Sequence, residues 1–178
     1  MNPSRIALLS KLMEMGGDIQ IFNHSSFGKE PIADVNVKSS ELNPCEVTPD
    51  DVPNLIDELP ILFIASSYAK GISSFNEIEE LKYKESDRLK AMQDGLDKMM
   101  IKNFLDGNVF YIEGMGQDYK SPNFFVETHY DHRIAMSFAI AGLNSNSSIE
   151  ISAPESINTS FPEFIELGKK LGCNFEIN

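Results

Sequence analysis

Three polar motifs in the sequence combine charged residues at spacings that suit the binding of an anion. The densest is KYKESDRL, in which Lys84 and Arg88 stand four positions apart. If this motif opens a helix, both cations share one face near its N-terminus, where free backbone N–H groups and the macrodipole already favour an anion. The motif therefore predicts an anion clamp. The alternative is a solvated helix start in which Lys84 pairs with Asp87, or Glu85 with Arg88, at little gain in stability.

The second motif, THYDHR, stands directly before an apolar helical stretch that begins near Ile134. His132 and Arg133 then fall at a helix N-terminus, where a cation opposes the dipole at a cost of a few tenths to about 1 kcal/mol unless an anion binds there. We therefore interpret both residues as ligand contacts. Alternatively, Asp131 caps the helix and pairs with Arg133, which leaves His132 as an ordinary polar residue.

The third motif, NLIDELP, places an acid beside a helix start. Pro60 suits a first helical position, so Asp57 is expected just outside the helix N-terminus. Its neighbours Ile56 and Leu59 are apolar, and partial burial would favour the protonated acid and make Asp57 a candidate proton shuttle. Helix capping is the alternative role. Because two of the three helices are apolar and buried, we expect the three motifs to converge at one end of the domain.

The elements that must position these motifs alternate between helices and short strands. Amphipathic helices run into strand-like stretches at three places, about 70 to 85 residues apart, which predicts a repeated supersecondary unit. A second class of helix is apolar almost all round and should be buried. Helices are predicted over 8–16, 59–69, 88–100, 132–143 and 164–172, and strands over 18–22, 34–38, 46–48, 73–76, 102–105, 109–112, 124–127, 148–151 and 174–177. This alternation indicates an α/β fold with helices inside a shell of sheets.

Composition bounds the classes of function. A chain of 178 residues suits a single domain over 1–178, and its net charge of −12 repels nucleic acid and anionic membranes. No apolar stretch approaches the ~20 residues of a membrane helix, and no signal peptide is evident, so we expect a cytoplasmic protein. Cys45 and Cys173 lack metal-ligand spacing, and no metal site is expected. Lysine outnumbers arginine by 12 to three, so the positions of Arg5, Arg88 and Arg133 are informative.

Longer stretches carry a family resemblance. NLIDELP, GISSFNEIEELKYKESDRLKAM, THYDHRIAMSFAIAGL and NTSFPEF occur in the order and spacing seen in 5-enolpyruvylshikimate-3-phosphate synthases, which the chain resembles over nearly its whole length. The resemblance implies an inside-out α/β barrel of βαβαββ units, with two such domains per enzyme and substrates between them at helix N-termini. It also implies enolpyruvyl transfer from phosphoenolpyruvate to shikimate 3-phosphate through a tetrahedral adduct, in the shikimate pathway of aromatic amino-acid biosynthesis, without metal or organic cofactor.

The resemblance also implies roles for individual residues. Asp57 would accept the proton of the shikimate 5-hydroxyl, and Lys84 would contact that substrate as well. Glu85 would share the proton transfers at the enolpyruvyl carbon. Arg88 and Arg133 would bind the phosphate and carboxylate of phosphoenolpyruvate, since lysine replaces a bidentate arginine poorly.

The resemblance also bears on His132, on Thr159 and on how much of the family's C-terminal domain the chain contains. His132 would support the phosphoenolpyruvate pocket, whereas Thr159 stands where some family members carry a lysine. The opening MNPSRIALLSKLMEMGGDI resembles an internal stretch of the family's C-terminal domain, so we expect a domain incomplete at its N-terminal edge. We expect such a chain to be inactive alone, as one half of an enzyme with a separately encoded N-terminal half or as a non-catalytic anion-binding remnant. It should self-associate through the exposed edge at Met1–Phe22.

Overall fold

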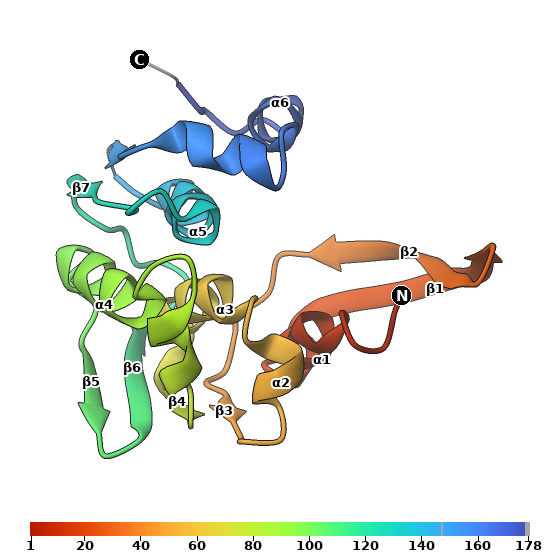
Figure 1. Ribbon diagram of the computed structural model, residues 1–178, viewed down its shortest axis with the longest axis horizontal. Helices are drawn as coiled ribbons and strands as arrows, with labels where there is room; N and C mark the ends of the chain where they lie inside the picture. The colour runs from red at the N-terminus through yellow and green to blue at the C-terminus, as the bar shows by residue number, and fades with distance from the viewer. Residues whose placement is uncertain (147, 177–178) are drawn as a thin grey trace.

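A computed structural model describes residues 1–146 and 148–176, which form short sheets packed against helices (Figure 1). Among the described residues, no helix is both long enough and apolar enough to cross a membrane. The helices are α1 (Ala7–Glu14), α2 (Val52–Leu55), α3 (Leu59–Ser67), α4 (Arg88–Lys98), α5 (His132–Gly142) and α6 (Phe164–Lys170), with 3₁₀ turns η1 (Glu79–Tyr83) and η2 (Pro154–Thr159). The strands are β1 (Asp18–Phe27), β2 (Glu30–Lys38), β3 (Glu46–Val47), β4 (Lys70–Asn76), β5 (Asn103–Asp106), β6 (Val109–Met115), β7 (Phe124–Val126) and β8 (Ile149–Ile151).

A four-stranded sheet with the order β3-β4-β6-β5 forms the centre of the fold. Strands β3 and β4 are parallel, and the pairs β4–β6 and β5–β6 are antiparallel. The segment from β3 to β6 reads β, α, β, α, β, β, with α3 and α4 as its main helices. The preceding α1, β1 and β2 match the last three elements of such a unit, and β7, α5 and β8 match the first three. This is the repeat that the sequence periodicity indicates.

Helix α3 packs its apolar surface against this sheet. Phe63 of α3 lies edge-on to Phe75 of β4 and Phe110 of β6, with ring centroids 4.6 and 5.1 Å apart. All three rings are fully buried. Edge-to-face pairs of this kind add about 0.5–1.5 kcal/mol each to the burial of the rings. The predicted buried helix over 59–69 therefore forms, and its N-terminus is held at one end of the sheet.

A glycine allows α4 and α5 to approach closely. A Cβ atom on Gly95 of α4 would lie 1.9 Å from the Phe138 ring of α5, which is fully buried. Any larger residue at Gly95 would have to push the two helices apart or move that ring out of the core. This contact brings the first residues of the two helices, Arg88 and His132, to the same end of the fold.

The structure corrects two predictions about the helices and strands. The helix over 132–143 was predicted to be buried all round, but it has a solvent-exposed side. Ile140 and Leu143 on this side are more than one-third exposed, and no described element covers them. The predicted strand over 174–177 is absent from residues 174–176, and residue 177 lies outside the described residues. Phe175 instead stacks on Phe164 of α6 at 5.6 Å, so the chain after α6 folds back onto its own helix.

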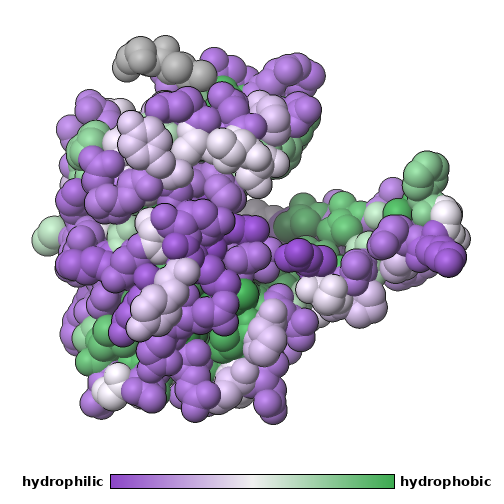
Figure 2. Space-filling view, in the orientation of Figure 1, coloured by the Kyte–Doolittle hydropathy of each residue, from purple (hydrophilic) through white to green (hydrophobic). Residues whose placement is uncertain are grey.

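Strands β1 and β2 form a long ribbon that extends away from the rest of the molecule (Figure 1). Val35 and Val37 pair across the ribbon with Ile21 and Ile19, so all four lie on one face. Ile19 is buried near α1, whereas Val35 and Val37 are 40% and 64% exposed. Hydrophobic surface is visible along the ribbon in the space-filling view (Figure 2). The ribbon therefore presents an apolar face that remains largely uncovered at Val35 and Val37.

Candidate functional site

Asp57 stands at the entrance to α3 and is the acid on which the site is centred. Its carboxylate lies 3.3 Å from Arg88 Nη1 and 3.4 Å from Arg133 Nη2. Glu58, and not Asp57, takes the N-cap position of α3, and no described side chain caps this helix. Pro60, in the first helical turn, has no backbone N–H that would need a capping partner. Asp57 therefore does not cap the helix. Its side chain is about one-third exposed and pairs with cations from two other helices.

Arg88, the first residue of α4, is fully buried and contacts a carboxylate through each of its three guanidinium nitrogens. Nε donates to Asp131 Oδ2 at 2.8 Å, Nη1 to Asp57 Oδ1 at 3.3 Å, and Nη2 to Glu85. The pairing of Glu85 with Arg88 was the surface alternative for this motif. In the structure Arg88 is buried, whereas Glu85 is more than half exposed. A buried guanidinium charge is stable only when acids or other hydrogen-bond acceptors surround it.

Asp131 caps α5 and joins that helix to α4. Its carboxylate accepts hydrogen bonds from the backbone N–H of Arg133 at 2.9 Å and from Ser86 Oγ at 3.0 Å, besides that from Arg88. Burial alone would raise the pKa of Asp131, but the hydrogen bond and charge of Arg88 and the other two donors hold it below its ordinary value. The capping alternative for THYDHR is thus observed, except that the side-chain partner of Asp131 is Arg88.

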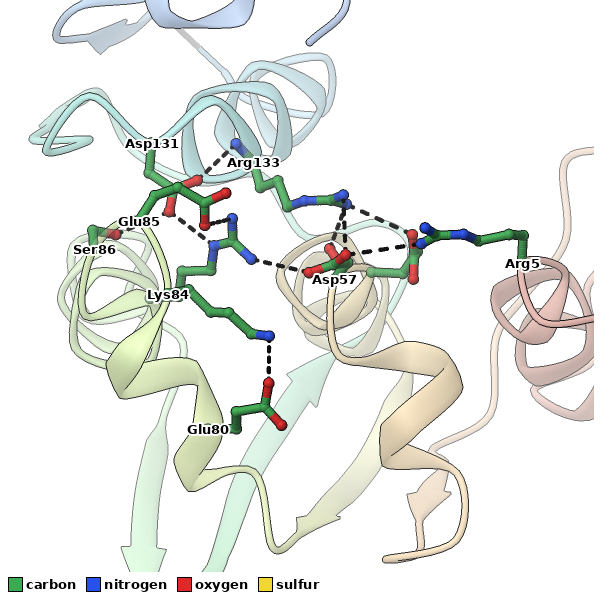
Figure 3. A network of polar contacts seen from close by, with 10 residues as sticks. Arg5, Asp57, Glu80, Lys84, Glu85, Ser86, Asp131 and Arg133 are labelled. Carbon is green, nitrogen blue, oxygen red and sulfur yellow. Dashed lines mark hydrogen bonds and ion pairs between the residues drawn. The ribbon is translucent and has the colours of Figure 1, made fainter. Parts of the chain in front are cut away.

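Arg133 reaches from the first turn of α5 to the start of α3 (Figure 3). Its Nη1 donates to the backbone carbonyl of Asp57 at 2.7 Å and lies 3.6 Å from Glu58 Oε1. Burial raises the pKa of Glu58, and the nearby Arg133 opposes that rise. Because its side chain is about one-quarter exposed, Arg133 retains an open side toward solvent.

The structure places Lys84 differently from its prediction. Lys84 is extended rather than helical and pairs with Glu80 of η1 (Figure 3). Helix α4 begins only at Arg88, because Asp87 takes the N-cap position and accepts from the Lys90 N–H at 2.9 Å. Lys84 and Arg88 are therefore not on one helical face, and the predicted clamp within KYKESDRL does not form in this way.

His132 is the first residue of α5, and within the described part of the chain its imidazole has no hydrogen-bond or ion-pair partner. A neighbouring histidine, His129, lies in a two-residue left-handed turn with Tyr130, with φ of 52° and 60°. His129 borders an open depression of about 290 Å³ that is also lined by Glu85, Ser86, Asp87, Lys90 and Ala91. Glu85 therefore pairs with Arg88 and also lines this depression.

The candidate residues of the three motifs that the structure joins directly are Asp57, Glu85, Arg88, Asp131 and Arg133. Sequence reasoning missed two further members. Arg5, in the turn before α1, lies 3.9 Å from Asp57 Oδ2, and Glu58 contacts Arg133. The rarity of arginine was the available signal for Arg5. For Glu58 the available signal was its place in the NLIDELP motif, directly after Asp57.

The rest of the described fold holds no metal site, and Cys45 is not a reactive thiol. Within residues 1–146 and 148–176, no group of three potential metal ligands lies close enough to hold an ion. Burial raises the pKa of the Cys45 thiol, whose Sγ lies 3.7 Å from Ser66 Oγ. A raised pKa disfavours the reactive thiolate, and the Cys45 side chain packs against the hydrophobic core.

Comparisons with known proteins agree on one family. The family profile described as EPSP synthase (3-phosphoshikimate 1-carboxyvinyltransferase) matches residues 1–167. A 3-phosphoshikimate 1-carboxyvinyltransferase of Zymomonas mobilis is 43% identical over 182 residues, which cover 99% of this chain and 40% of the relative. The chain thus spans about 40% of the length of the curated relatives it matches.

Solved structures show the same relationship. An EPSP synthase structure from Acinetobacter baumannii matches with a TM-score of 0.94 and 40% identity, over 100% of this chain and 41% of that one. The enolpyruvyl transferase NikO from Streptomyces tendae, with a TM-score of 0.68, 18% identity and coverage of 94% of this chain and 35% of that one, shares the fold. The enolpyruvyl transferase-like α/β fold predicted from the sequence is confirmed.

Proposed function

Because this chain belongs to the EPSP synthase family, we propose that it supplies part of the active site of a 3-phosphoshikimate 1-carboxyvinyltransferase, with residues 1–178 as one domain. The observation that carries the proposal is the contact of the Asp57 carboxylate with both Arg88 and Arg133. These residues come from the starts of three helices, where N-terminal dipoles add to the positive potential. A carboxylate among arginines suits an anionic substrate from which a hydroxyl proton must be removed.

The two candidate acids divide the proton transfers between them. Asp57 accepts the proton of the shikimate 3-phosphate 5-hydroxyl as that oxygen bonds to the central carbon of phosphoenolpyruvate. Glu85, in its neutral acid form, protonates the methylene carbon, which completes a tetrahedral adduct. Glu85 then takes a proton back from the resulting methyl group as the carbon–oxygen bond to phosphate breaks. The phosphate leaves with the proton that Asp57 had taken from the hydroxyl. The support for this division is that both carboxylates contact Arg88 but approach it from different elements.

The basic residues bind the anionic groups of the two substrates. Arg133 and Arg88 take the carboxylate and phosphate of phosphoenolpyruvate, with His132 beside them, and Lys84 contacts shikimate 3-phosphate. Because Arg88 is fully buried and is surrounded by three acids, an incoming anion reaches it only if one of these acids moves aside. Glu85, which is more than half exposed, is the partner that leaves most easily.

The remainder of the relatives' length must be supplied for turnover. We propose that the part of the relatives' length outside the match completes the site, and that the enzyme acts in the cytoplasm, where small phosphorylated metabolites are retained. The binding energy and catalytic groups of that part cannot come from this chain. We therefore expect no phosphate release from the two substrates by the chain alone.

A protein chimaera tests the function directly. Residues 1–178 replace the aligned region of the Zymomonas mobilis relative, and phosphate release is measured with shikimate 3-phosphate and phosphoenolpyruvate. We expect turnover that needs both substrates, because the chimaera restores the full length of the relative around this half of the site. A chimaera that folds and binds both substrates but releases no phosphate would favour a non-catalytic, anion-binding remnant.

We also propose that the isolated chain forms dimers through the apolar face of the β1–β2 ribbon. The sequence placed this contact at Met1–Phe22, and the most exposed apolar residues of the ribbon face are Val35 and Val37 on the partner strand β2. Uncovered apolar surface next to open strand edges favours pairing with a second copy. The expected result is a dimer at tens of micromolar, and Val35→Lys/Val37→Lys should return it to a monomer.

Light scattering with size-exclusion chromatography measures this change. The matched control is Leu171→Lys, because Leu171 is 84% exposed and lies after α6, away from the ribbon. A monomeric wild-type chain contradicts the proposal. So does a dimer that the control disrupts as strongly as the ribbon variant does.

A further inference from the structure

All three arginines of the chain converge on one carboxylate. Arg5, Arg88 and Arg133 lie in different parts of the sequence, yet each has a guanidinium nitrogen within ion-pair distance of Asp57, at 3.9, 3.3 and 3.4 Å. Of the 12 lysines in the sequence, none forms an ion pair with Asp57 within the described ranges. Arg88 and Arg133 already lie at 3.3 and 3.4 Å from this carboxylate, so Arg5 is its third and most distant cationic partner.

Arg5 is held much less firmly than the other two arginines. Its side chain is 66% exposed, and the contact with Asp57 at 3.9 Å is its one ion pair among the described residues. The Arg88 side chain, by contrast, is 1% exposed and contacts three acids. A long, exposed ion pair contributes little to stability, so the stability of the fold does not explain Arg5. Most of its five N–H donors face solvent at the edge of the site.

Arg5 and Arg133 approach the same oxygen atom, Asp57 Oδ2, from different elements, Arg133 from α5 and Arg5 from the turn before α1 (Figure 3). Arg133 is itself partly exposed, and so is Asp57 between them. Two guanidinium groups that meet at one accessible carboxylate oxygen present a pair of planar donor forks. Such forks match the oxygen atoms of a phosphate or a carboxylate, in shape as well as in charge.

We propose that Arg5 and Arg133 together bind one anionic group of the substrate above Asp57, with Arg5 as the arm that moves onto the ligand. The ligand class is a phosphate or a carboxylate on a small molecule. This inference rests on the proposed function, because it assigns Arg5 to the same site. It adds a third arginine, from the segment before α1, to the two that the sequence motifs marked.

Titration of the full chain with inorganic phosphate, followed by NMR at constant ionic strength, tests the proposal without turnover. A parallel titration with pyruvate distinguishes a carboxylate from a phosphate as the preferred group. We expect Arg5→Ala to weaken binding of the preferred anion by about tenfold, the size of a lost charged hydrogen bond. Arg5→Lys should recover only part of this loss, because an ammonium lacks the planar fork.

Lys38→Ala is the matched control. The Lys38 side chain is 60% exposed and lies 3.6 Å from Asp18, so its removal changes the same charge in a similar ion pair away from the site. Binding that is unchanged by Arg5→Ala would overturn the proposal, as would equal weakening by Lys38→Ala. Asp57→Asn should tighten binding, because the internal carboxylate no longer competes for the arginines. An inactive chimaera with Arg5-dependent anion binding would refute the proposed function and leave this inference standing.

Discussion

Replacement of Arg88 by alanine is expected to destabilise the protein by about 3–5 kcal/mol, the cost of leaving a buried acid without its cation. Asp131 is fully buried, and Arg88 Nε is its charged partner at 2.8 Å. Without the guanidinium, Asp131 keeps only Ser86 and the Arg133 N–H as donors. The loss also removes the link between α4 and the starts of α3 and α5. A change of this size is a large fraction of the total stability of a domain.

Urea unfolding, followed by circular dichroism, measures this effect. Arg133→Ala is the control, because Arg133 pairs with partly exposed acids and its loss should cost much less. Arg88→Met/Asp131→Leu should recover part of the stability, since replacing both members of a buried pair by apolar groups avoids the unpaired charge. If Arg88→Ala proves no more destabilising than Arg133→Ala, the buried network does not hold the three helices together.

The same network should make the fold sensitive to acid. Because Arg88 and the neighbouring donors lower the pKa of Asp131 below its ordinary value, this carboxylate binds its proton more weakly in the folded state than in the unfolded chain. Its contribution to stability is therefore complete above about pH 4 and is lost as the pH falls through the lowered, folded-state pKa. The double Arg88→Met/Asp131→Leu variant should lack this component of the acid transition.

Asp57→Asn in the active chimaera is expected to lower kcat by about 10²- to 10⁴-fold, the range for loss of a general base. Asparagine keeps the shape of the side chain and one acceptor for the arginines, but it cannot take the hydroxyl proton. KM for both substrates should change far less than kcat. Stopped assays of phosphate release across a range of each substrate would separate the two parameters.

Asp94→Asn is the control for this substitution. Asp94 is an acid of α4 whose side chain is about half exposed and pairs with Lys90 on the outer surface. Its loss should leave kcat unchanged. If Asp57→Asn instead raises KM for phosphoenolpyruvate at constant kcat, Asp57 positions the arginines and another group takes the proton.

Local patterns in the sequence were sufficient to predict most of the elements. The apolar run over 59–69 has no polar side, so it could form only a buried helix, and α3 is that helix. The alternation of helices with short strands indicated the repeated α/β unit, and the three helix-start motifs indicated where charged groups would gather. Asp57, Glu85, Arg88 and Arg133 do meet at that end of the fold. Each of these signals is local, because it depends on residues close together in the chain.

The folded structure decided which charges pair and which remain available. Lys84 does not share a helical face with Arg88, because Asp87 caps α4 and the helix begins only at Arg88. The spacing of the motif does not show which of its acids takes the N-cap position. Arg5 joins the site because the turn before α1 lies beside the start of α3, which brings together two segments far apart in the chain. Ion pairs act through space, so the partners of an arginine depend on how distant segments pack. The sequence by itself marked the helix starts that form the site, and packing determined that Asp57 lies at its centre.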